Sequence, residues 1–149
     1  MRLRNLNIRR FGDDTLEQYR ELVGHLASER EVAGLLYKRF PNFRGHGVLA
    51  VQKEMTIGLC GWRQDEGLGF LGPIVVLPEK RKWGVGRLML AHAVDALRAE
   101  GVRSVESAFP LGNTACGRLF AGFGFREVGN EEGEDGVEWA RVERILKKT

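Results

Sequence analysis

The sequence predicts one α/β domain over residues 1–149. Two observations lead to this class. Segments in which apolar and polar residues alternate are interspersed with segments of helical periodicity along the whole chain. The 149 residues are also enough for one sizeable core, and hydrophobic and charged contents of 43% and 29% are typical of globular proteins.

The N-terminal third is predicted to form one strand and two helices. Apolar and polar residues alternate over 3–10, which predicts a first strand at an edge of the sheet. A helix is predicted to begin near residue 14. The capping box Ser28-x-x-Glu31 predicts a second helix, which Pro41 ends.

Strands and helices also follow one another in the rest of the chain. Two β-favouring runs, 48–53 and 56–62, flank a polar turn and predict a hairpin, and residues 68–76 predict a further strand. A long amphipathic helix is predicted from about Gly84 to Glu100, and Gly101 ends it. The residues of this helix predicted to face the core are Val85, Leu88, Met89, His92 and Ala96. The predicted elements after it are a strand at 102–109, a short helix at 113–122, and strands at 125–128 and 137–146 around an acidic loop at 130–136.

The composition argues against several classes of partner. The net charge is +3 and the basic residues form no long run, so nucleic-acid binding is kept only as a weak alternative. No apolar run is long enough to span a bilayer and the first ten residues contain no apolar signal core, so we expect a cytoplasmic protein with no membrane partner. Cys60 and Cys116 lack metal-ligand or disulfide spacing, which predicts reduced thiols and no metal.

The segment 76–90 has the features of a diphosphate-binding site. An apolar strand leads into a short basic turn, and Gly84 and Gly86 then begin the long helix. The first N–H groups of a helix have no intrahelical partner, and glycine lets the backbone approach phosphate oxygens closely. Arg81, Lys82 and Arg87 supply positive charge beside them.

Two other phosphate-binding motifs do not fit the sequence. The dinucleotide fingerprint requires a third glycine at position 89, where this chain has Met89. The segment 112–119 has the glycine spacing of a P-loop, but it lacks the lysine and the Ser/Thr that contact phosphate and magnesium.

Two motifs resemble those of the GNAT superfamily of acyl-CoA-dependent N-acetyltransferases. Val76-Leu-Pro78 followed by Arg81-x-x-Gly84-x-Gly86 is similar to that family's acyl-CoA loop. The segment from Asn113 to Phe125 is similar to the family's next motif, in which Asn begins a short helix that ends in a Gly-Phe exit. The resemblance covers about 58–125 well, and the N-terminal third only by the order of elements.

The resemblance implies a fold, a reaction and partners. The fold is a mixed twisted sheet of six to seven strands with about four helices, in which strands 68–76 and 102–109 are parallel neighbours. The reaction is transfer of an acetyl group from acetyl-CoA to a primary amine of an unidentified small molecule, peptide or protein, by direct attack in a ternary complex. The resemblance to the family also implies a possible homodimer. The residues implied to contact the cofactor are Ile74, Val75, Val76, Arg81, Lys82, Trp83, Gly84, Val85, Gly86, Arg87, Asn113 and Phe120.

The candidate catalytic groups are few. The resemblance implies that the Val76 backbone amide polarises the thioester oxygen. An alkyl amine has a pKa of about 10, so a base or a relay water is needed. Glu106 is the first candidate because its strand is otherwise mostly apolar, and Asp65 and Glu66 come next. The alternative for Glu106 is an outward-facing strand residue paired with Arg103 or a lysine.

One position departs from the family pattern. Phe120 stands where the family usually has its general-acid tyrosine, and a phenyl ring cannot donate a proton. A thiolate with a pKa of about 8.5 is a tolerable leaving group, so a water can replace the tyrosine. The alternative is a non-catalytic acyl-CoA-binding sensor or regulatory protein. Cys116, one turn into the short helix, is either a small packed thiol or an acyl carrier.

Overall fold

The computed structural model describes residues 5–11, 16–24, 46–82, 84–133 and 136–146. The elements in chain order are β1 (Leu6–Phe11), α1 (Leu16–Gly24), β2 (His46–Gln52), β3 (Met55–Asp65), β4 (Leu68–Val76), the 3₁₀ turn η1 (Pro78–Lys80), α3 (Val85–Ala99), β5 (Ser104–Pro110), α4 (Thr114–Gly122), β6 (Arg126–Glu132) and β7 (Glu138–Ile145). The second predicted helix, 28–40, lies outside the described residues. No helix in the described ranges is both long and apolar enough to cross a membrane.

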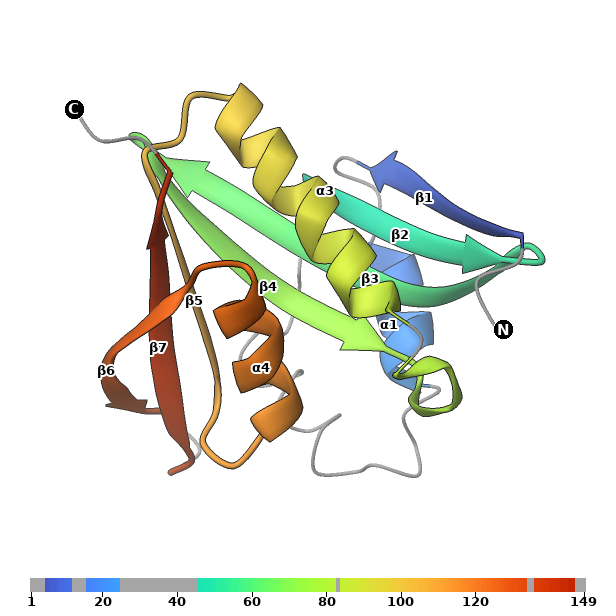
Figure 1. Ribbon diagram of the computed structural model, residues 1–149. Helices are drawn as coiled ribbons and strands as arrows, with labels where there is room; N and C mark the ends of the chain where they lie inside the picture. Colours follow the sequence, from blue (N-terminus) through green and yellow to red (C-terminus); the bar gives the residue numbers. More distant parts are fainter. Residues whose placement is uncertain (1–4, 12–15, 25–45, 83, 134–135, 147–149) are drawn as a thin grey trace.

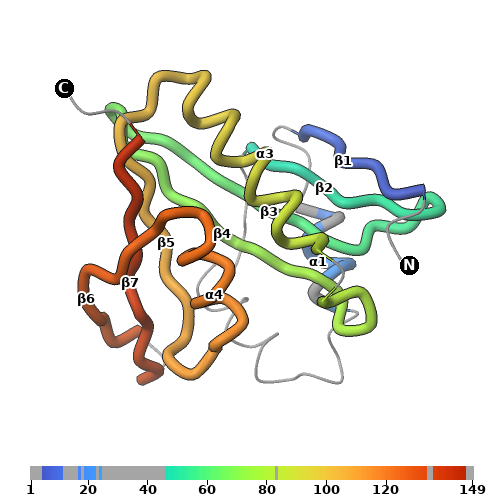
Figure 2. Tube along the Cα trace, viewed as in Figure 1, coloured from blue at the N-terminus to red at the C-terminus, as the bar shows by residue number. Residues whose placement is uncertain are grey.

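One mixed sheet of seven strands organises the molecule. Its strand order is β1-β2-β3-β4-β5-β7-β6, so the predicted edge position of the first strand is confirmed (Figure 2). All neighbouring strands are antiparallel except β4 and β5, which are parallel as expected. Helix α3 connects this parallel pair.

The β4–β5 pairing is short. It extends from Leu68 opposite Ser104 to Phe70 opposite Glu106, and the two strands then diverge toward their C-terminal ends (Figure 1). The Ser107 hydroxyl donates a hydrogen bond of 2.9 Å to the Leu71 carbonyl at the start of the divergence. The second half of β4 therefore has a strand partner on one side only among the described residues.

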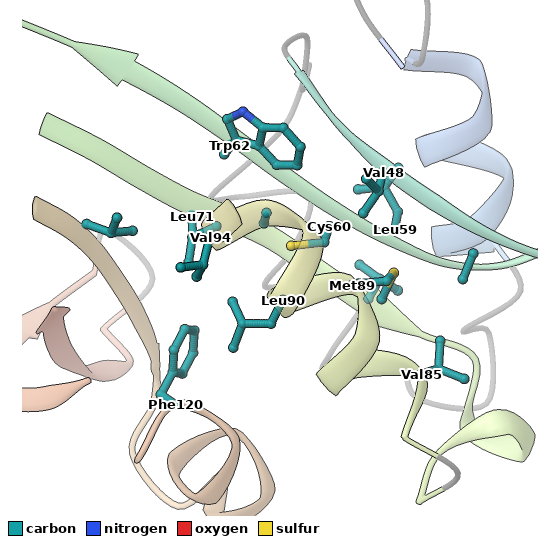
Figure 3. Close-up of a cluster of buried hydrophobic side chains, with 14 of the residues drawn as sticks. Val48, Leu59, Cys60, Trp62, Leu71, Val85, Met89, Leu90, Val94 and Phe120 are labelled. Carbon is teal, nitrogen blue, oxygen red and sulfur yellow. The ribbon is translucent and has the colours of Figure 1, made fainter. Parts of the chain in front are cut away.

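Helices cover both faces of the sheet. Figure 1 shows α3 in front of β2, β3 and β4, with α1 behind them. Figure 3 shows α3 side chains among the buried side chains of β2, β3 and β4. The buried α3 residues are Val85, Met89, Leu90, Ala93, Val94, Ala96 and Leu97.

The predicted buried face of α3 was partly wrong. Leu88 is 37% exposed and His92 is exposed, although both were expected in the core. Positions 90, 93, 94 and 97 follow the same helical spacing and are all apolar, and this set faces the sheet instead. His92 is therefore a surface residue.

The acidic segment after β6 was also predicted incorrectly. Strand β6 continues to Glu132, because Asn130 pairs with Ala140 and Glu131 with Trp139 of β7. Edge-strand pairing uses backbone groups, so acidic side chains on the exposed side do not prevent it. Glycines end the two C-terminal helices as predicted, with φ of 82° at Gly101 and 80° at Gly124.

Candidate active site

The divergence of β4 from β5 leaves backbone groups of β4 without a strand partner. The Leu77 N–H donates to the Ile57 carbonyl at 2.9 Å, and the antiparallel register continues with Val76 opposite Gly58 and Ile74 opposite Cys60. Successive residues of a strand point their N–H and C=O groups to opposite sides. The backbone groups of Ile74 and Val76 therefore point away from β3, and we call these groups the β4 edge.

The N-terminus of α3 lies next to the β4 edge. Gly84 is the N-cap residue with φ of 86°, and no described side chain caps the helix. A methyl group at Gly86 would lie 3.6 Å from Leu119 Cδ2 and 3.9 Å from Val76 Cγ2. The first turn of α3 therefore sits between the end of β4 and the middle of α4. Its N–H groups and dipole make this position suitable for an anion.

The basic residues around this turn differ in orientation. Lys82 and Arg87 are exposed, and Trp83 lies outside the described residues. Arg81 instead points back to the strand: its Nε donates a 2.9 Å hydrogen bond to the Val76 carbonyl, which belongs to the β4 edge. Its backbone N–H donates to the Pro78 carbonyl at 3.3 Å.

Helix α4 lies next to the first turn of α3. Asn113 caps it, because its Oδ1 accepts a 3.1 Å hydrogen bond from the Cys116 N–H, as the sequence predicted. Burial raises the pKa of the Cys116 thiol, and the positive charge of Arg81 lowers it. Arg81 thus contacts β4 directly and acts on α4 through its charge. Sequence spacing contained no signal for this orientation.

Phe120 belongs to the hydrophobic core. Its side chain is 1% exposed, stacks on Phe109 with ring centroids 5.9 Å apart and meets Phe125 edge-on at 5.1 Å. Its primary role in the structure is to join α4 to β5 through an aromatic cluster. The expected contact between Phe120 and a thioester stays a prediction.

The candidate bases lie at different distances from the β4 edge. Glu106 is at the level of Phe70, and its carboxylate is 3.8 Å from the Arg141 guanidinium with 29% of its side chain exposed. Strand β4 has one more residue than β3 between Leu71 and Ile74, so the rise is counted on β3. At about 3.3 Å per residue, this level is about 10 Å from Ile74 and about 17 Å from Val76. Asp65 and Glu66 lie still further away, at the β3–β4 turn.

Val75 and Val85 were also predicted from the sequence to contact the cofactor. Val75 is the one member of the 74–76 set that faces β3, since it pairs with Leu59 between the two residues of the β4 edge. Val85 belongs to the first turn of α3, and its side chain is buried. In the described parts of the chain, no three His, Cys, Asp or Glu side chains come together as a metal site.

Comparisons with known proteins agree with this architecture. The family model described as the acetyltransferase (GNAT) family matches residues 8–125. No protein of curated function matches the sequence significantly.

Solved structures show the same fold at low sequence identity. The ribosomal-protein-S18-alanine N-acetyltransferase from Escherichia coli is 19% identical with a TM-score of 0.74, over 97% of this chain and 96% of that one. Ard1 from Thermoplasma volcanium is 15% identical with a TM-score of 0.75, over 97% and 99%. The NatC complex bound to Gag peptide and CoA is 15% identical with a TM-score of 0.71, over 96% and 99%. On the strength of the family match, which spans the β4 edge, the α3 N-terminus and α4, the chain belongs to the GNAT family of acetyltransferases.

Proposed function

We propose that the protein is an N-acetyltransferase that moves an acetyl group from acetyl-CoA to a primary amine by direct attack in a ternary complex. The observation that carries the proposal is the β4 edge, which runs directly toward the N-terminus of α3, where no described side chain caps the helix. Acetyl-CoA matches this arrangement, because its diphosphate is joined to a linear arm that carries amide groups. The CoA bound in the structurally similar NatC complex supports the same choice of cofactor.

The diphosphate is proposed to bind at the first turn of α3. The N–H groups of Val85, Gly86 and Arg87 point out of this turn without intrahelical acceptors. Gly86 has no side chain to separate them from phosphate oxygens, and the exposed Lys82 and Arg87 provide counter-charge. An anion at this end of the helix also interacts favourably with the helix dipole.

The pantetheine arm is proposed to pair with the β4 edge as an added strand does. Because the diphosphate lies beyond Val76, the arm runs back along β4 toward Phe70. The thioester then lies nearer to Ile74 than to Val76. We therefore assign the polarising contact to the Ile74 N–H and the arm contacts to Val76, two residues along the strand from the sequence-based expectation. A preorganised donor of this kind is worth about 3 kcal/mol.

Proton transfer is proposed to involve Glu106 through water. The level of Glu106 in the sheet is about 10 Å from Ile74, beyond hydrogen-bond reach of an amine attacking there. Its exposed fraction of 29% lets water reach it. The leaving thiolate requires no tyrosine, because its pKa of about 8.5 makes it a tolerable leaving group near neutral pH.

The first acceptors to test are peptide N-termini. One similar structure is named as an alanine N-acetyltransferase of a ribosomal protein, and another holds a peptide together with CoA. Small polyamines and free amino acids form the second panel, because fold similarity alone does not select an acceptor.

Calorimetric titration with acetyl-CoA tests the proposal. The wild type should bind, and Gly86→Glu should not, since its carboxylate would face the diphosphate. Gly122→Glu is the matched control: Gly122 lies in α4, and a methyl group added there would meet nothing within 4 Å, so this variant should bind as the wild type does. Acceptor-dependent release of CoA thiol then tests catalysis. An absence of wild-type binding would refute the proposal, and binding without turnover on any acceptor would leave an acyl-CoA-binding protein.

A further inference from the structure

The side chain of Arg81 occupies a position that an added strand would need. The Val76 carbonyl points away from β3 and is one of the acceptors of the β4 edge. Arg81 Nε donates to this carbonyl at 2.9 Å. A pantetheine amide that pairs with the β4 edge would approach the same carbonyl oxygen that the Arg81 side chain already contacts.

The surroundings of Arg81 favour a change of partner. Its backbone is fixed in the turn after η1 by the hydrogen bond to the Pro78 carbonyl, and Gly84 begins α3 only three residues later. The long flexible side chain of arginine lets the guanidinium move while the backbone stays in place. A phosphate offers anionic oxygens in a geometry that guanidinium binds bidentately, whereas the Val76 carbonyl is a single neutral acceptor.

We propose that Arg81 exchanges partners when the cofactor binds, leaving the Val76 carbonyl to the pantetheine arm and binding the diphosphate. This inference rests on the proposed function and assigns Arg81 two opposing effects on affinity. Its contact with Val76 weakens binding of the arm, and its charge strengthens binding of the diphosphate. In acetyl-CoA the stronger binding of the diphosphate outweighs the weaker binding of the arm, and in a ligand that lacks the diphosphate only the effect on the arm remains.

The electrostatics of α4 agree with the observed orientation. Arg81 is the charge that lowers the pKa of the Cys116 thiol against the effect of burial, so the positive charge of Arg81 acts on the first turn of α4. Arg87, which follows Gly86 in the same turn, is exposed and has no such contact with β4 in the described part of the chain. Arg87 therefore serves as a control that shares the expected diphosphate contact and lacks the competing one.

The test compares acetyl-CoA with S-acetylpantetheine, which has the same thioester and arm but no phosphate. Dissociation constants are measured by NMR titration for wild type, Arg81→Ala and Arg87→Ala. Arg81→Ala should weaken acetyl-CoA by roughly tenfold or more and tighten S-acetylpantetheine by about three- to tenfold, the range expected for one hydrogen bond. Arg87→Ala should weaken acetyl-CoA and leave S-acetylpantetheine unchanged.

A second variant separates the two effects. Arg81→Gln keeps a donor for the Val76 carbonyl but has no charge, so it should weaken acetyl-CoA without tightening S-acetylpantetheine. Thermal unfolding of each variant shows whether it remains folded. Equal or weaker binding of S-acetylpantetheine to folded Arg81→Ala would overturn the exchange. That outcome is distinct from failure of the wild type to bind acetyl-CoA, which would refute the proposed function itself.

Discussion

Replacement of Gly86 by alanine should stabilise the fold while it weakens cofactor binding. The added methyl would lie 3.6 Å from Leu119 Cδ2 and 3.9 Å from Val76 Cγ2, which are ordinary van der Waals distances. Gly86 lies in the first turn of α3, and alanine is better than glycine in a helix by about 0.5–1 kcal/mol. The free energy of unfolding should therefore rise by up to about 1 kcal/mol, which corresponds to about 2–4 °C in Tm for a chain of this length.

The same methyl should interfere with the diphosphate. Under the proposed function, the phosphate oxygens approach the Gly86 N–H from the side on which glycine carries only hydrogen. Loss of that close approach should raise the Kd for acetyl-CoA at least about tenfold, or about 1.4 kcal/mol. Gly122→Ala is the matched control, because its methyl would meet nothing within 4 Å and lies at the C-terminal end of α4.

Two measurements test the predicted effects of Gly86→Ala on stability and on cofactor binding. Urea unfolding gives the stability of both glycine variants, and calorimetry gives their affinity for acetyl-CoA. An unchanged Kd for Gly86→Ala would show that the cofactor does not contact this residue, which would refute the placement of the diphosphate. A loss of stability would instead show that the space beside Leu119 and Val76 cannot accept a methyl group.

Three further predictions concern the chemistry and the core. Glu106→Gln should lower kcat by at least about 100-fold at an unchanged Kd for acetyl-CoA, as steady-state kinetics and calorimetry would show, and an unchanged kcat would exclude it as the base. Phe120→Ala should lower the free energy of unfolding in urea by about 3–5 kcal/mol, because it removes the central ring of a buried aromatic cluster, and a loss below about 1 kcal/mol would contradict that packing. In Arg81→Ala the pKa of Cys116 should rise, since the lowering charge is gone, so iodoacetamide should alkylate this thiol more slowly at about pH 8. Burial raises the pKa of Cys60 to about 12, which makes it an unreactive internal reference, and an unchanged alkylation rate would contradict the proximity of Arg81.

The order of elements could be predicted because each segment carries its own periodicity. Strand β4 was predicted with its observed limits, since an apolar run there ends at Pro78. The cap at Asn113 was predicted because its side chain acts on a backbone only three residues away. These features depend on local interactions, which a single sequence displays directly.

The errors concern properties that tertiary contacts decide. Two sets of apolar positions compete on α3, and only packing against the sheet decides that Leu90 is buried and Leu88 exposed. The sequence predicts that Arg81 binds phosphate, which stays a prediction, but the observed rotamer of Arg81 depends on an acceptor at Val76 that is available only because β4 and β5 diverge. The distance between Glu106 and the β4 edge is likewise set by strand register, and the role of Glu106 as a base stays a prediction.

The divergence of β4 from β5 has a consequence for the protein's solubility. It creates a strand edge inside the sheet, and such edges recruit strands from other molecules. The Arg81 side chain limits this hazard, because its Nε occupies the carbonyl of Val76. Removal of Arg81 should therefore favour self-association through β4, and acetyl-CoA should suppress it by covering the same edge.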